Sequence, residues 1–314
     1  MNVTIVGLDV VGTSLGLALK AASAEISVTG HDPDAQRVSR AKKLRAIDHS
    51  HWNLISACEK SDLILLALGL DAVEDTLRAL RDTLKERTII MDLLPLKGPV
   101  MAWAEDILPE TVQFVGGHVV CSRLAPGQME PSAELLQGAT FYLVAPEKAA
   151  PWALETASNL ALAVGAKPLF IDAVEHDGLM AATSGLPLLG ALALMEAVTG
   201  GAGLRERAQS IGGEFAAFAN ALIHMPEAPA DLVAANRDNL LYWLDAYAAK
   251  LAELRELASA KDVQALKDKF VAAQQVCAEW LTTGGAPRSE LPVEDVGGGF
   301  RAMFLGGLGR KRPR

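Results

Sequence analysis

The chain has 314 residues, half of them hydrophobic, and a formal net charge of −9 at pH 7. Its length allows two domains with a sizeable core, and its acidic balance argues against a surface that binds nucleic acid. The three cysteines, Cys58, Cys121 and Cys277, are widely separated and form no metal-ligand spacing, so we expect reduced thiols, a cytoplasmic protein and no metal site.

The first predicted unit is a strand, a glycine turn and a helix. Val3–Val6 is a short apolar run typical of a buried strand. Gly7 permits a sharp turn after it, and Gly12 lets the next helix approach the strand closely. This pattern predicts a Rossmann fold. The residues expected to bind the pyrophosphate of a dinucleotide are Gly7, Leu8, Asp9, Val10, Val11 and Gly12.

The middle position of this turn departs from the G-x-G-x-x-G pattern, because Asp9 stands where glycine is usual. The carboxylate adds bulk and a negative charge. At roughly 6 Å from a phosphate and an effective dielectric of about 40, the repulsion is on the order of 1–1.5 kcal/mol. We therefore expect dinucleotide binding to be weakened about tenfold rather than abolished.

A second predicted strand, Ile26–Gly30, leads to an acidic residue. Asp32 follows Gly12 by twenty residues, the spacing at which a carboxylate can bind the ribose hydroxyls of a dinucleotide. A carboxylate there favours NAD, and NADP fits less well because its 2′-phosphate would be repelled.

The remaining pattern divides the chain in two. Strand and helix patterns alternate in the first half, which predicts a doubly wound, mainly parallel α/β sheet. After about Val174 the strand patterns stop, and an all-α region follows. The further strands are expected at Leu63–Leu68, Thr88–Met91, Gln113–Val115, Thr140–Val144 and Lys167–Ile171, and the helices at Asp71–Leu84, Glu175–Val198, Leu204–Ile223, Ala230–Leu257 and Val263–Leu281.

We therefore expect a Rossmann domain over residues 1–172 and a helical dimerisation or substrate domain over residues 173–314, with an irregular arm from residue 283. Leu186–Val198 is apolar on nearly every face, which suits a helix buried between neighbours or between two subunits. We expect a homodimer through this domain. The apolar stretch is too short to span a membrane, and the first residues predict a strand rather than a signal peptide.

Several short motifs occur in a characteristic order. They are Gly7–Leu15, Ser61–Ala67, Met91–Lys97, Phe114–His118, Leu135–Phe141, His176-Asp177 and Thr183–Pro187. Over about residues 1–280, these motifs resemble the prephenate/arogenate dehydrogenase family of tyrosine biosynthesis. The resemblance places Ala67 and Leu68, at the end of a predicted strand, beside the cofactor.

The resemblance implies an oxidative decarboxylation. In that family a histidine accepts the proton of the ring hydroxyl of the substrate while hydride passes to NAD(P)+, and carbon dioxide then leaves. His118 is the residue that matches this base, and we expect it on a loop at the carboxyl edge of the sheet. A neutral imidazole suits proton transfer near pH 7, although a purely structural histidine stays an alternative.

Other family positions are changed. Pro95 replaces the serine of a D-x-x-S-x-K motif, and Gly185 replaces the histidine of an S-H-L-P motif. No arginine occurs in Phe215–Ala221, where the family has one. Because prephenate is a dianion, it requires polar and cationic partners. The candidates that remain for its binding are Lys97, Arg123 and Ser184.

Three functions remain open. The first is a prephenate dehydrogenase-like enzyme with a small-molecule substrate. The second is a catalytically degenerate paralogue that acts as a nucleotide-binding or regulatory dimer. The third is a β-hydroxyacid dehydrogenase-like enzyme, which ranks last because that group uses a lysine in its helical domain and no lysine occurs between Lys167 and Lys250. None of the three implies a nucleic-acid or membrane partner.

Overall fold

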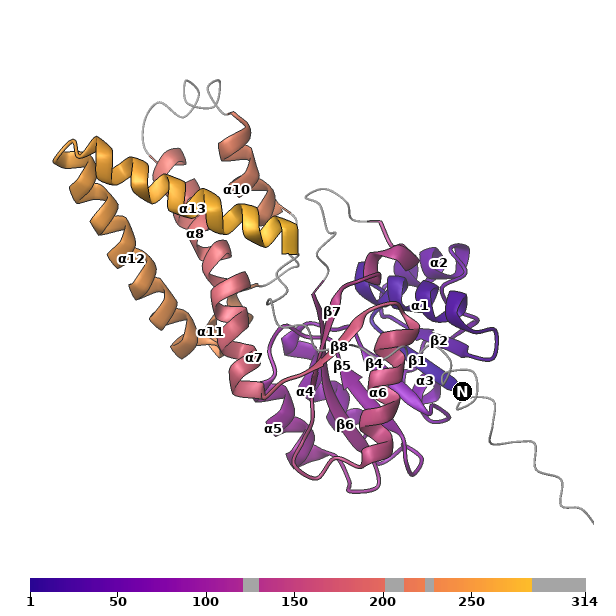
Figure 1. Ribbon diagram of the computed structural model, residues 1–314. Coiled ribbons are helices and arrows are strands. Elements are labelled where there is room, and N and C mark those ends of the chain that lie inside the picture. The colour runs from indigo at the N-terminus through magenta and orange to yellow at the C-terminus, as the bar shows by residue number, and fades with distance from the viewer. Residues whose placement is uncertain (121–129, 201–211, 224–228, 284–314) are drawn as a thin grey trace, which may run out of the picture. The chain divides into compact units, whose positions relative to one another are not determined.

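The computed structural model describes residues 1–120, 130–200, 212–223 and 229–283. The chain divides into two compact units, Met1–Tyr247 and Ala248–Arg314, and each is described by itself. The first unit contains an eight-stranded sheet with helices on its faces (Figure 1).

The sheet has the strand order β3-β2-β1-β4-β5-β6-β7-β8. Every neighbouring pair is parallel except β6 and β7, which are antiparallel. This topology confirms the predicted Rossmann-type, mainly parallel sheet. The strands are β1 (Asn2–Val6), β2 (Ser27–His31), β3 (His49–Ser50), β4 (Leu63–Leu66), β5 (Ile89–Asp92), β6 (Gln113–Val120), β7 (Thr140–Val144) and β8 (Lys167–Phe170).

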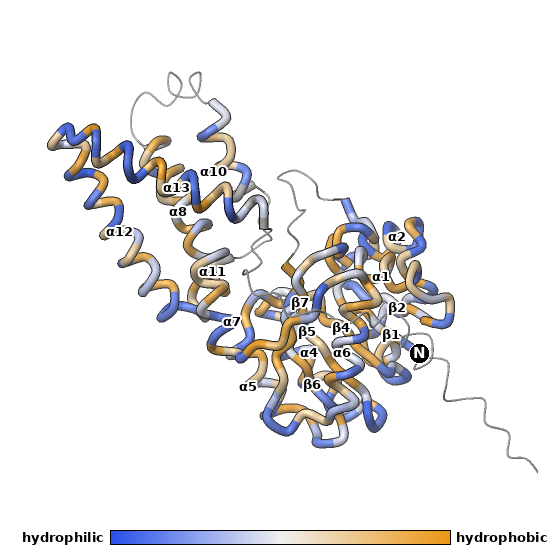
Figure 2. Tube along the Cα trace, in the orientation of Figure 1, coloured by the Kyte–Doolittle hydropathy of each residue, from blue (hydrophilic) through white to orange (hydrophobic). Residues whose placement is uncertain are grey.

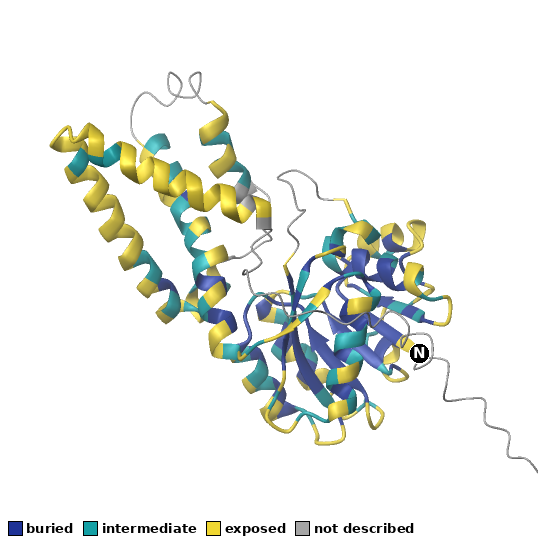
Figure 3. Ribbon diagram, viewed as in Figure 1, coloured by how far each residue is buried: buried dark blue, intermediate teal, exposed yellow. Residues whose placement is uncertain are grey.

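The side chains of successive strand residues are buried on opposite faces of the sheet. In β4, Leu63 and Leu65 pack with helices α1 (Val10–Ala22) and α6 (Pro151–Ala163) on one side, where Ala41 of α2 (Ala35–Lys43) and Leu136 of η1 (Ala133–Leu136) also lie. Ile64 and Leu66 pack on the other side with α3 (Leu54–Cys58), α4 (Leu70–Leu80) and α5 (Gly98–Ile107). The central strands are buried on both faces (Figure 3), which explains their unbroken apolar sequences.

Strand β6 changes partner along its length. Its first residues pair in parallel with β5, as far as Met91 opposite Val115. From Gly116 onward it pairs antiparallel with β7, with His118 opposite Tyr142. The strand therefore continues beyond the carboxyl end of β5, and the sequence predicted only its first three residues.

Helices follow the sheet without further strands in the described residues. They are α7 (Ala173–Met180), a π-helical turn η2 (Ala181–Gly185), α8 (Leu186–Thr199), α10 (Gly213–Ile223), α11 (Pro229–Ala235), α12 (Arg237–Ser259) and α13 (Val263–Thr283). The expected helix over Ala230–Leu257 is interrupted at Asn236, and the first part of the helix expected over Leu204–Ile223 lies outside the described residues.

The helix predicted over Glu175–Val198 is confirmed as one helical run. Ala173–Thr199 is continuous over 27 residues, with a mean hydropathy of 1.6, and by length and composition alone it could cross a membrane. The expectation that the apolar stretch is too short to span a membrane considered Leu186–Val198 alone, whereas the helical run through η2 is long enough. The core helix of a soluble protein can pass the same test.

The second unit contains the end of α12 and helix α13. An ion pair at 2.6 Å joins Glu253 of α12 to Lys269 of α13. Several large apolar side chains on α13 are exposed, among them Phe270, Val276 and Trp280. In Figure 2 orange segments alternate with blue ones along both helices, and in Figure 3 both are mostly yellow.

Two of the three cysteines lie in the described residues, and both are free thiols. Cys58 is buried against the sheet, and burial raises the pKa of its thiol to about 12. Cys277 is exposed on α13, and Cys121 lies outside the described residues. The domain boundary expected after residue 172 and the irregular arm expected from residue 283 stay predictions.

The turn after β1 gives a direct stability test. Gly7 has φ +94°, and a Cβ atom there would lie 2.0 Å from the carbonyl oxygen of Ala67. We expect Gly7→Ala to lower the free energy of unfolding by about 2 kcal/mol or more, measured by urea denaturation. The control is Gly178→Ala on α7, where a Cβ would meet no atom within 4 Å. It should raise stability by up to about 1 kcal/mol, and equal effects of the two changes would contradict this view of the turn.

Candidate functional site

Two glycines shape the first turn. The main chain of Gly7 lies against the end of β4, and a Cβ on Gly12 would lie 2.1 Å from the carbonyl oxygen of Gly7. Ala67 and Leu68, both half-buried, follow β4 at the same edge of the sheet, and the amide of Ala67 donates to Val6. The predicted turn and the predicted end of β4 are therefore adjacent at the carboxyl edge of the sheet, where such folds bind nucleotides.

Asp32 braces this turn from the end of β2. Its carboxylate is buried and accepts hydrogen bonds from the amides of Leu8, at 2.7 Å, and Asp34, at 2.8 Å. The guanidinium of Arg37 lies 3.8 Å from it. Asp32 thus lies at the predicted strand end and orders the segment that would face a nucleotide.

Asp9 is the N-cap of α1, a role that the sequence interpretation missed. Its carboxylate accepts a hydrogen bond from the amide of Gly12 at 2.7 Å. Such amides at a helix N-terminus are the groups that bind phosphate in this fold. Asp9 as a whole residue is exposed, but its carboxyl lies close to the turn and is partly desolvated. This desolvation raises the pKa of the carboxyl, and the hydrogen bond from Gly12 opposes the rise.

A buried ion pair supports the strand that carries His118. Lys97 follows β5 and is fully buried, and its ammonium group contacts the carboxylate of Asp92 and donates to the carbonyl oxygen of Gly117 at 2.6 Å. The other oxygen of Asp92 accepts from the amide of Gly117 at 3.3 Å. Burial raises the pKa of Asp92 and lowers that of Lys97, and the attraction between the two groups opposes both shifts.

His118 lies within β6 and not on a loop, so that part of the prediction was wrong. The antiparallel pairing with β7 extends the strand through it, and β5 has already ended there. Its imidazole lies between Tyr142, with ring centroids 6.3 Å apart, and His176, at 5.2 Å. Burial, followed by the charge of Lys97 and the proximity of His176, lowers the pKa of His118 well below its usual value. The ring is therefore neutral at pH 7.

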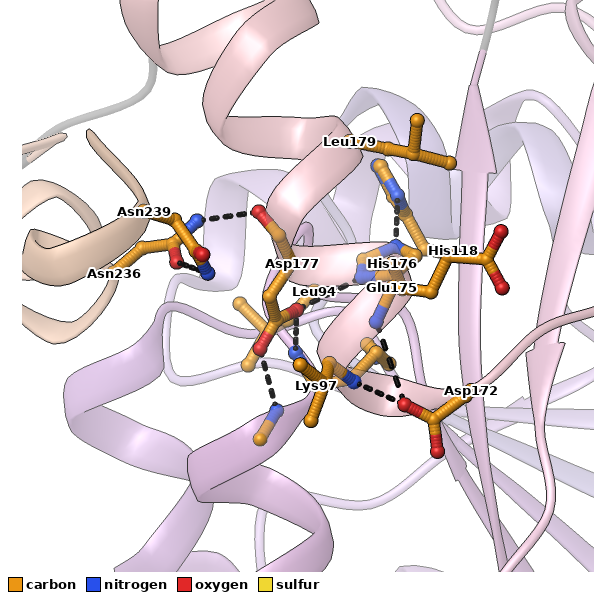
Figure 4. A network of polar contacts seen from close by, with 12 residues as sticks. Leu94, Lys97, His118, Asp172, Glu175, His176, Asp177, Leu179, Asn236 and Asn239 are labelled. Carbon is orange, nitrogen blue, oxygen red and sulfur yellow. Dashed lines mark hydrogen bonds and ion pairs between the residues drawn. The ribbon is translucent and has the colours of Figure 1, made fainter. Parts of the chain in front are cut away.

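A chain of hydrogen bonds leads from His118 to α7 and α5 (Figure 4). Nδ1 of His118 lies 3.0 Å from Nε2 of His176, and Nδ1 of His176 lies 2.9 Å from Oδ1 of Asp177. The same carboxylate accepts from the amides of Lys97 and Gly98, each at 2.7 Å. Asp177 thus caps the N-terminus of α5, which has no capping side chain from its own segment.

The sequence matches two profiles from one family of enzymes. Residues 15–169 match the nucleotide-binding domain of prephenate dehydrogenase, and residues 172–272 match its dimerization domain. The chain belongs to the prephenate dehydrogenase family.

Individual relatives are distant. The chain is 24% identical to the prephenate dehydrogenase of Bacillus subtilis, over 87% of this chain and 74% of that protein. It is 26% identical to the cyclohexadienyl dehydrogenase of Zymomonas mobilis, over 87% and 94%. Its fold is similar to that of Aquifex aeolicus prephenate dehydrogenase, crystallised with hydroxyphenyl propionate and NAD+. That match has a TM-score of 0.79 at 22% identity and covers 88% of this chain and 98% of the other.

The changed family positions have structural consequences. Leu240 occupies the space beside Gly185, and a Cβ there would lie 2.4 Å from a Leu240 methyl group. Asn236 lies at the break between α11 and α12, where its side chain donates to the carbonyl oxygen of Asp177 at 2.8 Å.

The predicted substrate ligands are not brought together among the described residues. Lys97 is buried with partners from the protein itself, and Ser184 is exposed on the π-helical turn. Arg123 lies outside the described residues. All three stay predictions as substrate ligands. The sequence interpretation had omitted His176, Asp177 and Asp92 from the site, although all three belong to motifs that it quoted.

The role of Asp9 can be tested by nucleotide binding. Asp9→Asn keeps an oxygen that can cap α1 but removes the charge, and Asp9→Gly removes both. We expect either change to tighten NAD+ binding about tenfold, measured by calorimetry.

Lowering the pH should have the same effect on the unchanged protein. Because the pKa of Asp9 is raised, protonation on acidification removes the repulsion at a higher pH than for an ordinary aspartate, and affinity rises as pH falls. Asp9→Asn should not show this rise. Equal affinity of all three proteins for NAD+ would refute the claim that Asp9 opposes the phosphates.

Proposed function

We propose that this protein oxidises a cyclic hydroxy acid of the prephenate or arogenate type with NAD+, in an oxidative decarboxylation of tyrosine biosynthesis. The observation that carries the proposal is His118, a neutral imidazole at the carboxyl edge of a Rossmann sheet with one ring nitrogen already paired to His176. Membership of the prephenate dehydrogenase family and the names of the relatives support the reaction type.

The residues of the first turn fit NAD. Gly7 and Gly12 permit the sharp turn and the close approach of α1 to β1, so that the N-terminus of α1 lies where a pyrophosphate would bind, and Asp32 follows β2, where it can bind a ribose. Its carboxylate disfavours the 2′-phosphate of NADP. Asp9 must give up its bond to Gly12 or share that amide with a phosphate, which weakens binding without blocking it.

His118 acts as the base in the proposed reaction. Its Nε2 accepts the proton of the ring hydroxyl as the C–H bond at the same carbon breaks. NAD+, when held at the first turn, would supply the acceptor for the hydride. The C–C bond to the ring carboxylate then breaks, its electron pair makes the ring aromatic, and carbon dioxide leaves. Lys97 and Asp92 hold the main chain of Gly117, which directly precedes the base.

The helical part is proposed to form a homodimer, as the description of the matching profile suggests. Exposed apolar side chains on α12 and α13, such as Tyr242 and Trp280, offer surface for such a contact. A cytoplasmic location and the lack of a nucleic-acid or membrane partner stay predictions.

The proposal predicts that His118→Asn abolishes most turnover and leaves NAD+ binding intact. We expect kcat to fall about 10²–10⁴-fold, the usual contribution of a general base. The assay follows NADH at 340 nm with prephenate, arogenate and a panel of hydroxy acids. For the unchanged protein, kcat/KM should be level at neutral pH and fall only below the usual histidine range, because the pKa of His118 is lowered.

Asp82→Asn, at an exposed side chain after the end of α4, serves as the control and should leave NADH production per active site unchanged. If the unchanged protein binds NAD+ but oxidises none of these substrates, the proposed activity is wrong and a nucleotide-binding, catalytically degenerate paralogue is favoured.

A further inference from the structure

The donor and the acceptor of each hydrogen bond between Asp177 and His118 can be assigned by starting at the carboxylate of Asp177. Both oxygens of its carboxylate accept from backbone amides, which can only donate: Oδ1 from Lys97 and Oδ2 from Gly98. Oδ1 also contacts Nδ1 of His176 at 2.9 Å. An ionised carboxylate can only accept, so Nδ1 of His176 carries a proton.

This assignment passes to His118. In a neutral His176, protonation of Nδ1 leaves Nε2 as an acceptor. Nδ1 of His118 lies 3.0 Å away and must then be the donor. A neutral His118 protonated at Nδ1 has its lone pair on Nε2, the nitrogen without a partner in this chain of bonds. The base is thereby set in the tautomer that can accept a proton.

We propose that His176 and Asp177 are positioning residues that fix the tautomer and the ring orientation of His118. The inference rests on the proposed function for its catalytic consequence, but the tautomer itself is a property of the protein alone. The arrangement is analogous to the way in which a buried carboxylate orients a catalytic histidine in hydrolases, with a second imidazole inserted between them.

These two hydrogen bonds, from His118 to His176 and from His176 to Asp177, form a relay that also stabilises the product of the proton transfer. When Nε2 of His118 takes the proton of the substrate hydroxyl, the O–H bond breaks and an imidazolium forms. Its Nδ1–H still donates to His176, whose own Nδ1–H donates to the negative charge of Asp177. No proton moves along the relay. Its effect is to orient dipoles toward a positive charge that exists only after transfer.

The groups that face His118 come from three elements. His176 approaches from α7, Tyr142 from β7, and the charge of Lys97 from the segment after β5, where it is paired with Asp92. Of these, only His176 is hydrogen-bonded to the imidazole of His118 in the described structure. His176 also packs edge-on against Tyr142, with ring centroids 5.5 Å apart, so a test of its hydrogen bonds needs replacements that fill the same space.

Two substitutions at His176 distinguish the effect of its hydrogen bonds from the effect of its packing against His118. Gln can donate from its amide nitrogen to Asp177 and accept from His118 with its oxygen, so His176→Gln keeps the polarity. His176→Leu fills the space but keeps neither bond. We expect kcat to fall about 10²-fold in His176→Leu, with KM for NAD+ unchanged, and His176→Gln to restore most of that loss.

An NMR titration of ¹⁵N-labelled histidines gives a result that does not depend on turnover. At neutral pH the unchanged protein and His176→Gln should show His118 protonated at Nδ1 and not at Nε2. In His176→Leu the Nε2–H tautomer should gain population. Asp172→Asn is the control, because Asp172 caps α7 through the amides of Val174 and Glu175 and makes no contact with His118 in the described hydrogen bonds. It should leave the tautomer unchanged.

The outcomes are distinguishable. A His118 protonated at Nε2 in the unchanged protein overturns the relay, whatever the activity. The expected tautomers without turnover of any tested substrate support the relay and contradict the proposed function. Equal tautomer populations in His176→Leu and His176→Gln show that His176 only packs against His118.

Discussion

The carboxylate of Asp177 is the contact on which the site depends. It accepts the amides of Lys97 and Gly98, which begin α5, and the ring of His176, which precedes it on α7. A carboxylate at a helix N-terminus satisfies amides that the helix itself leaves unpaired and interacts favourably with the helix dipole. Here the cap comes from about eighty residues further along the chain. The side chain of Asp177 thereby joins α7 to the start of α5 and, through His176, aligns His118, the proposed base.

The second constraint is the buried pair of Lys97 and Asp92. Taking both charges out of water is costly, and such a pair is seldom a net source of stability. Its geometry suggests another reason for it: both members bond to Gly117, the residue before His118. Since Asp177 binds the amide of Lys97 as well, the loop after β5 is held at both its backbone and its side chain. The imidazole of His118 is thus positioned by its own strand, β6, and by the segment after β5 that contains Lys97.

Much of the fold could be predicted from the sequence because it depends on local patterns. Apolar runs of four or five residues marked the central strands. Gly7 and Gly12 marked a turn in which these two positions tolerate no Cβ. The cap at Asp9 was also predictable in principle, since aspartate is favoured at an N-cap. It was missed because the residue was compared with a cofactor motif and not with a helix start.

The site could be predicted only in part, because its geometry depends on contacts between distant segments. The strand through His118 is extended by pairing with β7, and the burial of Lys97 depends on the approach of β5 and β6. The motif His176-Asp177 was visible in the sequence. Its function was not, because it requires the N-terminus of α5 and the side chain of His118 to meet at one carboxylate.

The central claim is that Asp177 ties α7 to α5, and amide hydrogen exchange measures this most directly. In Asp177→Asn, an NH2 group replaces an oxygen that accepts an amide. Exchange should become faster in the first turn of α5 and along α7, and stay unchanged in α1. Asp34→Asn, at the N-cap of α2, is the matched control and should affect only α2. If Asp177→Asn leaves exchange in α5 and α7 as it is in the unchanged protein, Asp177 does not hold these helices together.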